Sequence, residues 1–122
     1  MVIGVGFGAI GKAGKPDSIS FLNQKIADEN VIDRISGSNY GGNKTILSCD
    51  FDSESIKGCN KMGSSIPMPL EYLCAGGDSG GGLFKLVAGQ WYLVGICSGG
   101  KTDIKQLNKT GYYGQIINWT RI

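Results

Sequence analysis

Apolar residues in this chain recur mainly at strand spacing, and helical repeats of apolar residues are scarce. Residues 19–35 fit neither repeat cleanly and favour a strand with a bulge. Turns or loops are expected over residues 8–18, 36–43 and 52–69, while residues 118–122 could start a terminal helix. Strands are expected over residues 1–7, 45–51, 83–87, 91–97 and 112–117.

Residues 83–87 and 91–97 predict a β-hairpin, because both runs are rich in strand formers and a short glycine-containing loop joins them. Many short strands between frequent turns are typical of an all-β domain, either a barrel or a sandwich. The length of 122 residues suits one domain, so residues 1–122 are treated as a single unit.

The amino-acid composition argues against several classes of function. Glycine occurs 21 times, which favours turns and close backbone approaches over long helices. The net charge is only +2 and no basic block occurs, so neither nucleic acid nor a membrane surface is expected as a partner. No apolar run approaches the ~18 residues of a membrane span. Histidine is absent, so any mechanism that uses an imidazole must obtain it from outside this chain.

The opening glycines resemble a nucleotide-binding fingerprint, because Gly6-x-Gly8-x-x-Gly11 follows an apolar run. Such a fingerprint needs a helix that starts within the glycines and holds the phosphate at its N-terminus. Here Gly14 and Pro16 follow within a few residues, and both oppose a helix. We therefore expect a strand and a turn whose glycines permit close packing, and no nucleotide or other cofactor.

The most specific motif is LCAGGDSGGGLF, over residues 73–84. Its Gly-Asp-Ser-Gly-Gly core, together with the hairpin that follows it, resembles the nucleophile region of trypsin-like serine proteases. Residues 6–8, 110–116 and 118–119 carry further parts of the resemblance: a Gly-aromatic-Gly segment, a late strand and the start of a terminal helix. The resemblance implies a Greek-key antiparallel β-barrel, the second half of a two-barrel fold whose N-terminal barrel this sequence lacks.

The resemblance also implies roles for individual residues. Ser79 would be the nucleophile of a serine endopeptidase acting on a polypeptide substrate, and the N–H groups of Gly77 and Ser79 would form the oxyanion hole. The missing barrel would supply the histidine and the aspartate of the triad. Asp78 would point inward and pair with a newly cut N-terminal ammonium. The residues expected to bind the substrate backbone are Ser98, Gly99, Gly100 and Gly111.

One departure from the family pattern limits what can be inferred about specificity. The family normally has additional residues between its Cys-Ala-Gly and its Gly-Asp-Ser, which build one wall of the primary pocket. Here Cys74-Ala75-Gly76 runs directly into Gly77, so no side-chain preference is predicted. Two alternatives stay open: a protease-like binding module without catalysis, and an unrelated small β domain.

Four cysteines, without a C-x-x-C pair, lack the spacing of a zinc site. Asp50, Asp52 and Glu54 are interrupted by Phe51 and lack the following glycine of a calcium loop, so no metal is expected. Two disulfides with three connectivities are conceivable, and buried free thiols are the alternative. The preferred pairs would suit a secreted, periplasmic or extracellular protein. These pairs are Cys49–Cys59, which closes a short loop, and Cys74–Cys97, which ties the approach to Ser79 to the hairpin.

Overall fold

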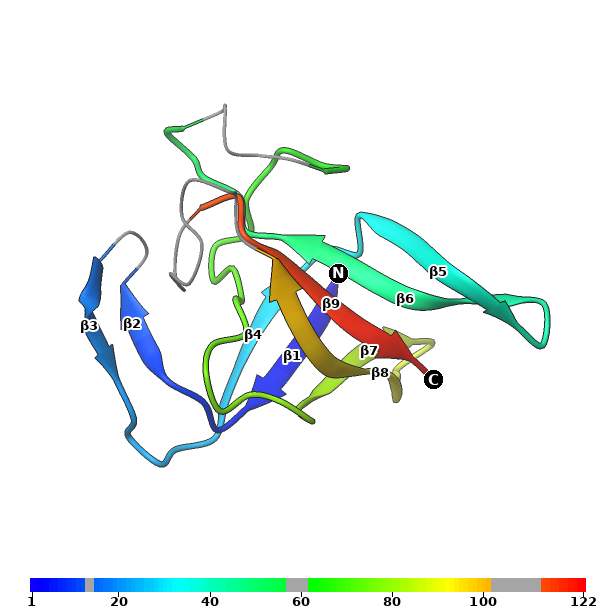
Figure 1. Ribbon diagram of the computed structural model, residues 1–122, viewed down its shortest axis with the longest axis horizontal. Helices are drawn as coiled ribbons and strands as arrows, with labels where there is room; N and C mark the ends of the chain where they lie inside the picture. The colour runs from blue at the N-terminus through cyan, green and yellow to red at the C-terminus, as the bar shows by residue number, and fades with distance from the viewer. Residues whose placement is uncertain (13–14, 57–61, 102–112) are drawn as a thin grey trace.

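The computed structural model describes residues 1–12, 15–56, 62–101 and 113–122, and every regular element in them is a β-strand (Figure 1). The prediction of an all-β chain is therefore confirmed. None of the described residues forms a helix long and apolar enough to cross a membrane. The strands are β1 (Val2–Gly6), β2 (Ile10–Lys12), β3 (Lys15–Ser20), β4 (Ile26–Asn30), β5 (Arg34–Tyr40), β6 (Asn43–Asp50), β7 (Gly82–Val87), β8 (Gln90–Lys101) and β9 (Ile116–Arg121).

Seven of these strands form one antiparallel sheet in the order β4-β1-β7-β8-β9-β6-β5, and β2 pairs with β3 in a separate two-stranded sheet. The large sheet is not closed, because β4 and β5 are its two edges. Figure 1 shows that it is strongly curved. The curvature brings Val2 of β1 and Leu47 of β6 into one core cluster, although three strands separate β1 from β6 in the sheet.

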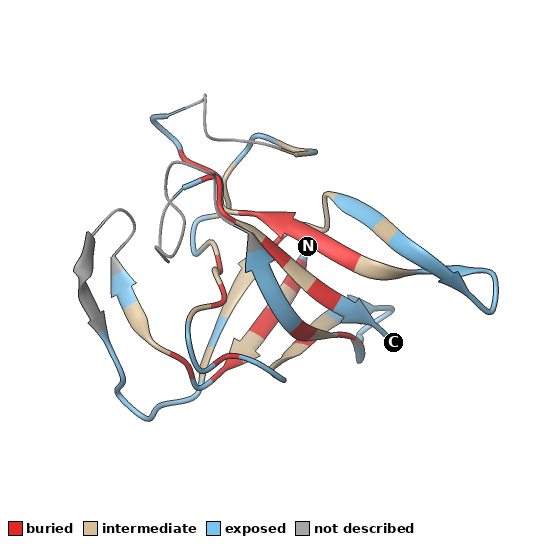
Figure 2. Ribbon diagram, viewed as in Figure 1, coloured by how far each residue is buried: buried red, intermediate tan, exposed pale blue. Residues whose placement is uncertain are grey.

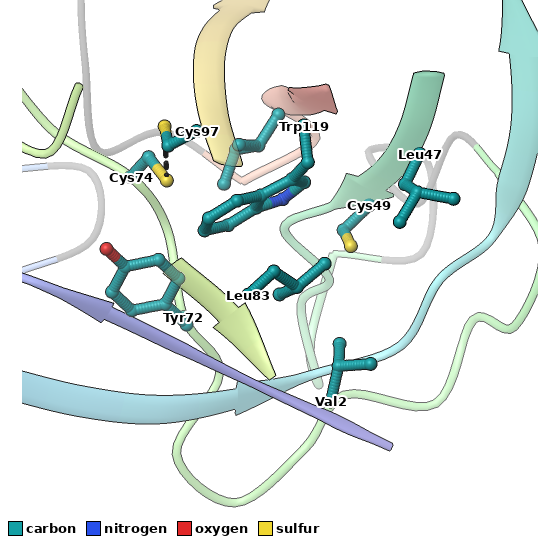
Figure 3. Packing of buried hydrophobic residues seen from close by; sticks show 9 residues of the cluster. Val2, Leu47, Cys49, Tyr72, Cys74, Leu83, Cys97 and Trp119 are labelled. Atoms are coloured by element: carbon teal, nitrogen blue, oxygen red, sulfur yellow. Dashed lines mark hydrogen bonds between the residues drawn. The ribbon is translucent and has the colours of Figure 1, made fainter. Parts of the chain in front are cut away.

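The core lies on the concave side of this sheet and centres on Trp119, which is 1% exposed (Figures 2 and 3). Ile117 and Trp119 alternate with less buried residues along β9, as expected for a strand with one face toward the core. The Tyr72 ring packs at a tilt against Trp119, with 6.1 Å between ring centroids. The buried apolar side chains are Val2, Leu47, Cys49, Tyr72, Cys74, Leu83, Cys97, Ile117 and Trp119.

The expected terminal helix is wrong, because residues 116–121 form β9. This strand pairs with β6 on one side and with β8 on the other, so both of its backbone edges are satisfied within the sheet. A helix of a few residues would gain few hydrogen bonds for the cost of nucleation. Pairing on both edges therefore decides the structure of this segment.

Three other predictions of secondary structure are also corrected. Residues 36–43 are not a loop: β5 and β6 form a hairpin whose turn is only Gly41-Gly42, both with positive φ. Its polar character arises because β5 is a solvent-exposed edge strand (Figure 2). Residues 8–18 contain strand pairing between β2 and β3 rather than a turn throughout. The single bulged strand expected over residues 19–35 is instead the end of β3, all of β4 and the start of β5.

The predicted hairpin after the Gly-Asp-Ser motif is confirmed. Strands β7 and β8 pair in antiparallel register from Gly82↔Ile96 to Val87↔Gln90. Ala88 and Gly89 form the tight turn, with φ values of 49° and 79°. These left-handed values match the twist of the flanking strands, as in two-residue hairpin turns.

Candidate functional site

The segment from Cys74 to Gly81 carries Ser79 and leads into β7. Backbone hydrogen bonds fasten it to the first part of the chain: Tyr72 N–H donates to the Glu29 carbonyl at 2.6 Å, and Ala9 N–H donates to the Gly76 carbonyl at 2.9 Å. The segment is therefore held on the end of the sheet where β1 and β4 pair.

Asp78 is the buried anchor of this segment, at 5% exposed. Its carboxylate accepts the N–H of Gly8 at 2.7 Å on Oδ1 and the N–H of Ala75 at 2.9 Å on Oδ2. Its own N–H donates to the Ala75 carbonyl at 3.1 Å, and its carbonyl accepts the N–H of Gly81 at 2.8 Å. With its backbone and both carboxylate oxygens bonded, Asp78 fixes two consecutive turns. These turns leave the next residue, Ser79, exposed.

Gly6 and Gly8 leave the space that the buried carboxylate of Asp78 occupies. A Cβ built on Gly6 would overlap Oδ1 of Asp78, and one on Gly8 would lie 2.5 Å from Asp78 Cγ. Gly4 lies in the same way under the ring of Tyr72. The prediction that these glycines permit close packing is confirmed, and strand β2 follows them where a nucleotide site would need a helix.

The backbone around Ser79 has a shape that requires glycine. Gly77 has φ +97° and Gly80 has φ +84°, in the region that side chains rarely adopt. Gly80 N–H donates to the Cys97 carbonyl at 3.0 Å, and Cys97 N–H donates to the Gly81 carbonyl at 2.8 Å. The segment is thereby clamped to β8 immediately after Ser79.

The amides predicted as an oxyanion hole make no hydrogen bond within the described part of the chain. Among the hydrogen bonds of the described residues, neither the N–H of Gly77 nor that of Ser79 donates one. The Ser79 hydroxyl likewise has no hydrogen-bond partner among these residues. The chain contains no histidine, so no imidazole of its own can deprotonate Ser79.

Three of the predicted substrate-binding residues lie on an exposed part of β8. Strand β7 pairs with β8 only as far as Ile96, whereas β9 follows β8 to Lys101. Ser98, Gly99 and Gly100 are exposed, and Ser98 Oγ donates to the Asn118 carbonyl at 3.1 Å. Among the described strands, this part of β8 is therefore paired on one edge alone. The fourth residue, Gly111, lies outside the described residues.

A bulge in the β8–β9 pairing lies at the start of this exposed stretch, between Cys97 and Gly99. Gly99 has φ +152°, and a Cβ built on it would meet no atom within 4 Å. Among the described residues, nothing fills the space beside Gly99. The backbone angle itself favours glycine there.

Two of the four cysteines meet in the core beneath the Ser79 segment. The Sγ atoms of Cys74 and Cys97 lie 2.9 Å apart, and both are free thiols in this structure. Figure 3 shows the two sulfurs next to each other. Cys49 is a third buried free thiol. Burial raises its pKa to about 12, and the nearby carboxylates of Asp33 and Asp50 add to the rise. The preferred partner of Cys49 in the sequence, Cys59, lies outside the described residues.

A cluster of carboxylates was not singled out from the sequence as a unit. Asp33 accepts the N–H of Ser64 at 3.2 Å, and Asp50 accepts the N–H of Met62 at 2.8 Å. Glu71 accepts the N–H groups of Asp52 at 3.0 Å and of Met68 at 2.6 Å. These bonds organise the connection between β6 and the Ser79 segment. Asp33 directly precedes β5 and Asp50 is the last residue of β6, so both acidic residues lie at strand ends.

Burial raises the pKa values of three carboxyl groups in this cluster. It raises the pKa of Asp33 to about 6, and it raises the pKa of Asp52 to about 7 with help from the charge of Asp50. The pKa of Glu71 is also raised by burial. One carboxylate oxygen of Asp52, Oδ1, is buried without a hydrogen-bond partner. In the described part of the chain, no group of three or more His, Cys, Asp or Glu residues is arranged to hold a metal ion.

Comparisons with protein-family models, with curated proteins and with solved structures find no match. The function is therefore inferred from the arrangement around Asp78 and Ser79 and from the sequence resemblance.

Proposed function

We propose that this chain is the serine-bearing half of a trypsin-like serine endopeptidase, with the triad histidine and aspartate supplied from outside it. The observation that carries the proposal is the pair of turns built on buried Asp78, which leaves Ser79 exposed. Among the described residues, the N–H groups of Gly77 and Ser79 donate no hydrogen bond. A chance glycine-rich turn would not need a fully bonded, buried carboxylate next to its serine.

The chemistry would proceed through an acyl-enzyme. A histidine from the missing barrel takes the proton of Ser79 Oγ, and the oxygen attacks the scissile carbonyl. The N–H groups of Gly77 and Ser79 stabilise the negative oxygen of the tetrahedral intermediate, and one such donor is worth ~3–4 kcal/mol in the transition state. The leaving amine departs with the proton, and water then hydrolyses the acyl-enzyme.

The exposed edge of β8 supports the same proposal. An extended polypeptide would add as a strand beside Ser98, Gly99 and Gly100, where β7 no longer covers β8. Backbone pairing at this edge would hold the substrate in register with Ser79, because Gly80 is bonded to Cys97 just before Ser98. The curved seven-stranded sheet supports the proposal of a Greek-key barrel as the finer description of the fold.

The proposal also implies binding partners and a location for the protein. Its partners would be a polypeptide substrate and the missing N-terminal barrel, and its location would be outside the cell or in the periplasm. The side chain preferred next to the cleaved bond stays open, because Cys74-Ala75-Gly76 leaves no room for the usual pocket wall before the two turns on Asp78.

A second candidate function rests on the absence of a base at Ser79. With no histidine in the chain, the exposed β8 edge could bind extended peptides without cleaving them. The two functions differ in one respect: a catalytic Ser79 becomes acylated when an imidazole is available, and a relic serine does not.

The test is labelling by a fluorophosphonate probe, with and without free imidazole to replace the missing base. Ser79→Ala is compared with Ser38→Ala, which removes an exposed serine on β5. We expect imidazole-dependent labelling at Ser79 that Ser79→Ala abolishes and Ser38→Ala retains. Labelling spread over several exposed serines, or equal labelling of Ser79→Ala, would place the binding function first.

A further inference from the structure

Two buried sulfurs lie close enough to react with each other. The Sγ atoms of Cys74 and Cys97 are 2.9 Å apart, and the side chains are 9% and 6% exposed. They come from positions 23 residues apart in the chain, one at the start of the Ser79 segment and one in β8 (Figure 3). A disulfide bond is ~2.05 Å long, so about 1 Å of movement would join them.

The same two residues border the Ser79 segment on both sides. On the β8 side, the backbone of Cys97 bonds Gly80 and Gly81, the two residues that follow Ser79. On the other side, Cys74 directly precedes Ala75, whose N–H holds Asp78 Oδ2. The segment between the two sulfurs therefore includes the anchor, the serine and the clamp to β8.

We propose that Cys74 and Cys97 form a redox modification site, and that their reversible disulfide locks the Ser79 segment onto β8. The formation of the disulfide stands on the geometry of the two sulfurs. Its effect on Ser79 as a nucleophile rests on the proposed function.

The oxidation balances with hydrogen peroxide as the oxidant. The thiolate of Cys97 attacks peroxide, which forms a sulfenic acid and releases hydroxide. The sulfur of Cys74 then attacks the Cys97 sulfur: the S–S bond forms, the S–O bond breaks, and water leaves with the Cys74 proton. In total two thiols are oxidised and one peroxide is reduced to two waters. A thiol reductant reverses the reaction by exchange.

The roles of the two sulfurs follow from their electrostatics. The hydrogen bond to Cys74 lowers the pKa of Cys97, whereas that bond and burial raise the pKa of Cys74. We take Cys97 as the thiolate that meets the oxidant and Cys74 as the resolving thiol, and exchanging the two roles would give the same disulfide. A small oxidant suits sulfurs of such low exposure. Cys49 is the control, because it is also buried, at 1% exposed, and its pKa is raised to about 12.

The test uses the folded chain with hydrogen peroxide and then with dithiothreitol. Cleavage after lysine places Cys74 on residues 62–85 and Cys97 on residues 86–101, while Cys49 and Cys59 fall on two other peptides. We expect these two peptides to be linked after oxidation, with a loss of two hydrogens. The thermal midpoint should rise on the order of 10 °C, because the link constrains the unfolded chain. Hydrogen exchange over residues 75–81 should slow, and reduction should reverse all three changes.

Single cysteine-to-alanine variants test which two cysteines form the disulfide. Cys97→Ala and Cys74→Ala should each abolish the three changes, and Cys49→Ala should retain them. The proposal is overturned if the folded parent chain does not link these peptides, or if it links them with unchanged exchange over residues 75–81. Neither readout needs a reactive serine, so both can also be measured in Ser79→Ala. A parent chain that the probe does not label, but that keeps the full redox response, would refute the catalytic proposal alone.

Discussion

The N–H of Gly8 donates a 2.7 Å hydrogen bond to the carboxylate of Asp78, which lies 70 residues further along the chain. This bond joins the first strand to the residue before the candidate nucleophile. It makes the opening glycines and the Gly-Asp-Ser motif parts of one structural unit. It also leaves Asp78 bonded to backbone amides in this structure, so its pairing with a newly cut N-terminal ammonium stays a prediction.

Gly8→Ala should disturb this unit. The new Cβ would lie 2.5 Å from Asp78 Cγ, so the carboxylate must move, and overpacking of this kind costs about 1–3 kcal/mol. Chemical denaturation measures the loss. Gly76→Ala is the control, because a Cβ there meets nothing within 4 Å. Equal stability of the two variants would contradict the close packing of Gly8 on Asp78.

Asp78→Asn should weaken the turn without changing its size. Both carboxylate oxygens accept N–H groups, so the amide NH₂ must face a donor, Gly8 or Ala75. Such a mismatch costs about 1–3 kcal/mol. We expect lower thermal stability and slower imidazole-dependent labelling of Ser79. If labelling of the folded fraction keeps its parental rate, Asp78 stabilises the loop and has no part in arranging the oxyanion hole.

Ser79→Ala should separate function from stability. Ser79 is exposed and its hydroxyl has no partner among the described residues, so the free energy of unfolding should change by less than about 0.5 kcal/mol. Probe labelling should be lost. A large loss of stability would mean that the hydroxyl has a structural role, and the exposed geometry described here would be wrong.

Stability should fall as pH rises from about 4 to about 7. Burial raises the pKa of Asp33 to about 6 and that of Asp52 to about 7 from 3.8, so the folded chain binds more protons than the unfolded chain in this window. Stability contributed by these protonated groups is then present below pH 3.8 and lost as pH rises through the folded pKa values.

Asp52→Asn tests this assignment. The variant cannot ionise at this position, so its thermal midpoint should drop less than that of the parent between pH 5 and pH 7.5, by about a few degrees. Thermal melts at both pH values measure the difference. Glu54→Gln removes an exposed carboxylate nearby and should behave like the parent. Identical pH responses of Asp52→Asn and the parent would show that Asp52 does not titrate in this window.

Local sequence determined those features that depend on neighbouring residues. The β7–β8 hairpin followed from two strand-forming runs around a tight glycine-containing turn, and Gly77 and Gly80 marked a backbone shape that few other residues adopt. The absence of histidine already meant that any imidazole base for Ser79 would have to come from outside the chain. Gly6 and Gly8 indicated that another group packs closely against the backbone, but no neighbouring residue in the sequence identified that group.

Tertiary structure decided the features that depend on pairing across the chain. Residues 116–121 became β9 because β6 and β8 offer hydrogen bonds on both of its edges, which no local propensity can reveal. The polar residues of β5 became a strand because β6 pairs with them along a solvated edge. Asp78 became an anchor because β1 pairs with β7, which brings Gly8 to its carboxylate. The sulfurs of Cys74 and Cys97 meet because the Ser79 segment is clamped to β8. Such contacts join residues far apart in sequence, so their energies exist only once the chain has folded.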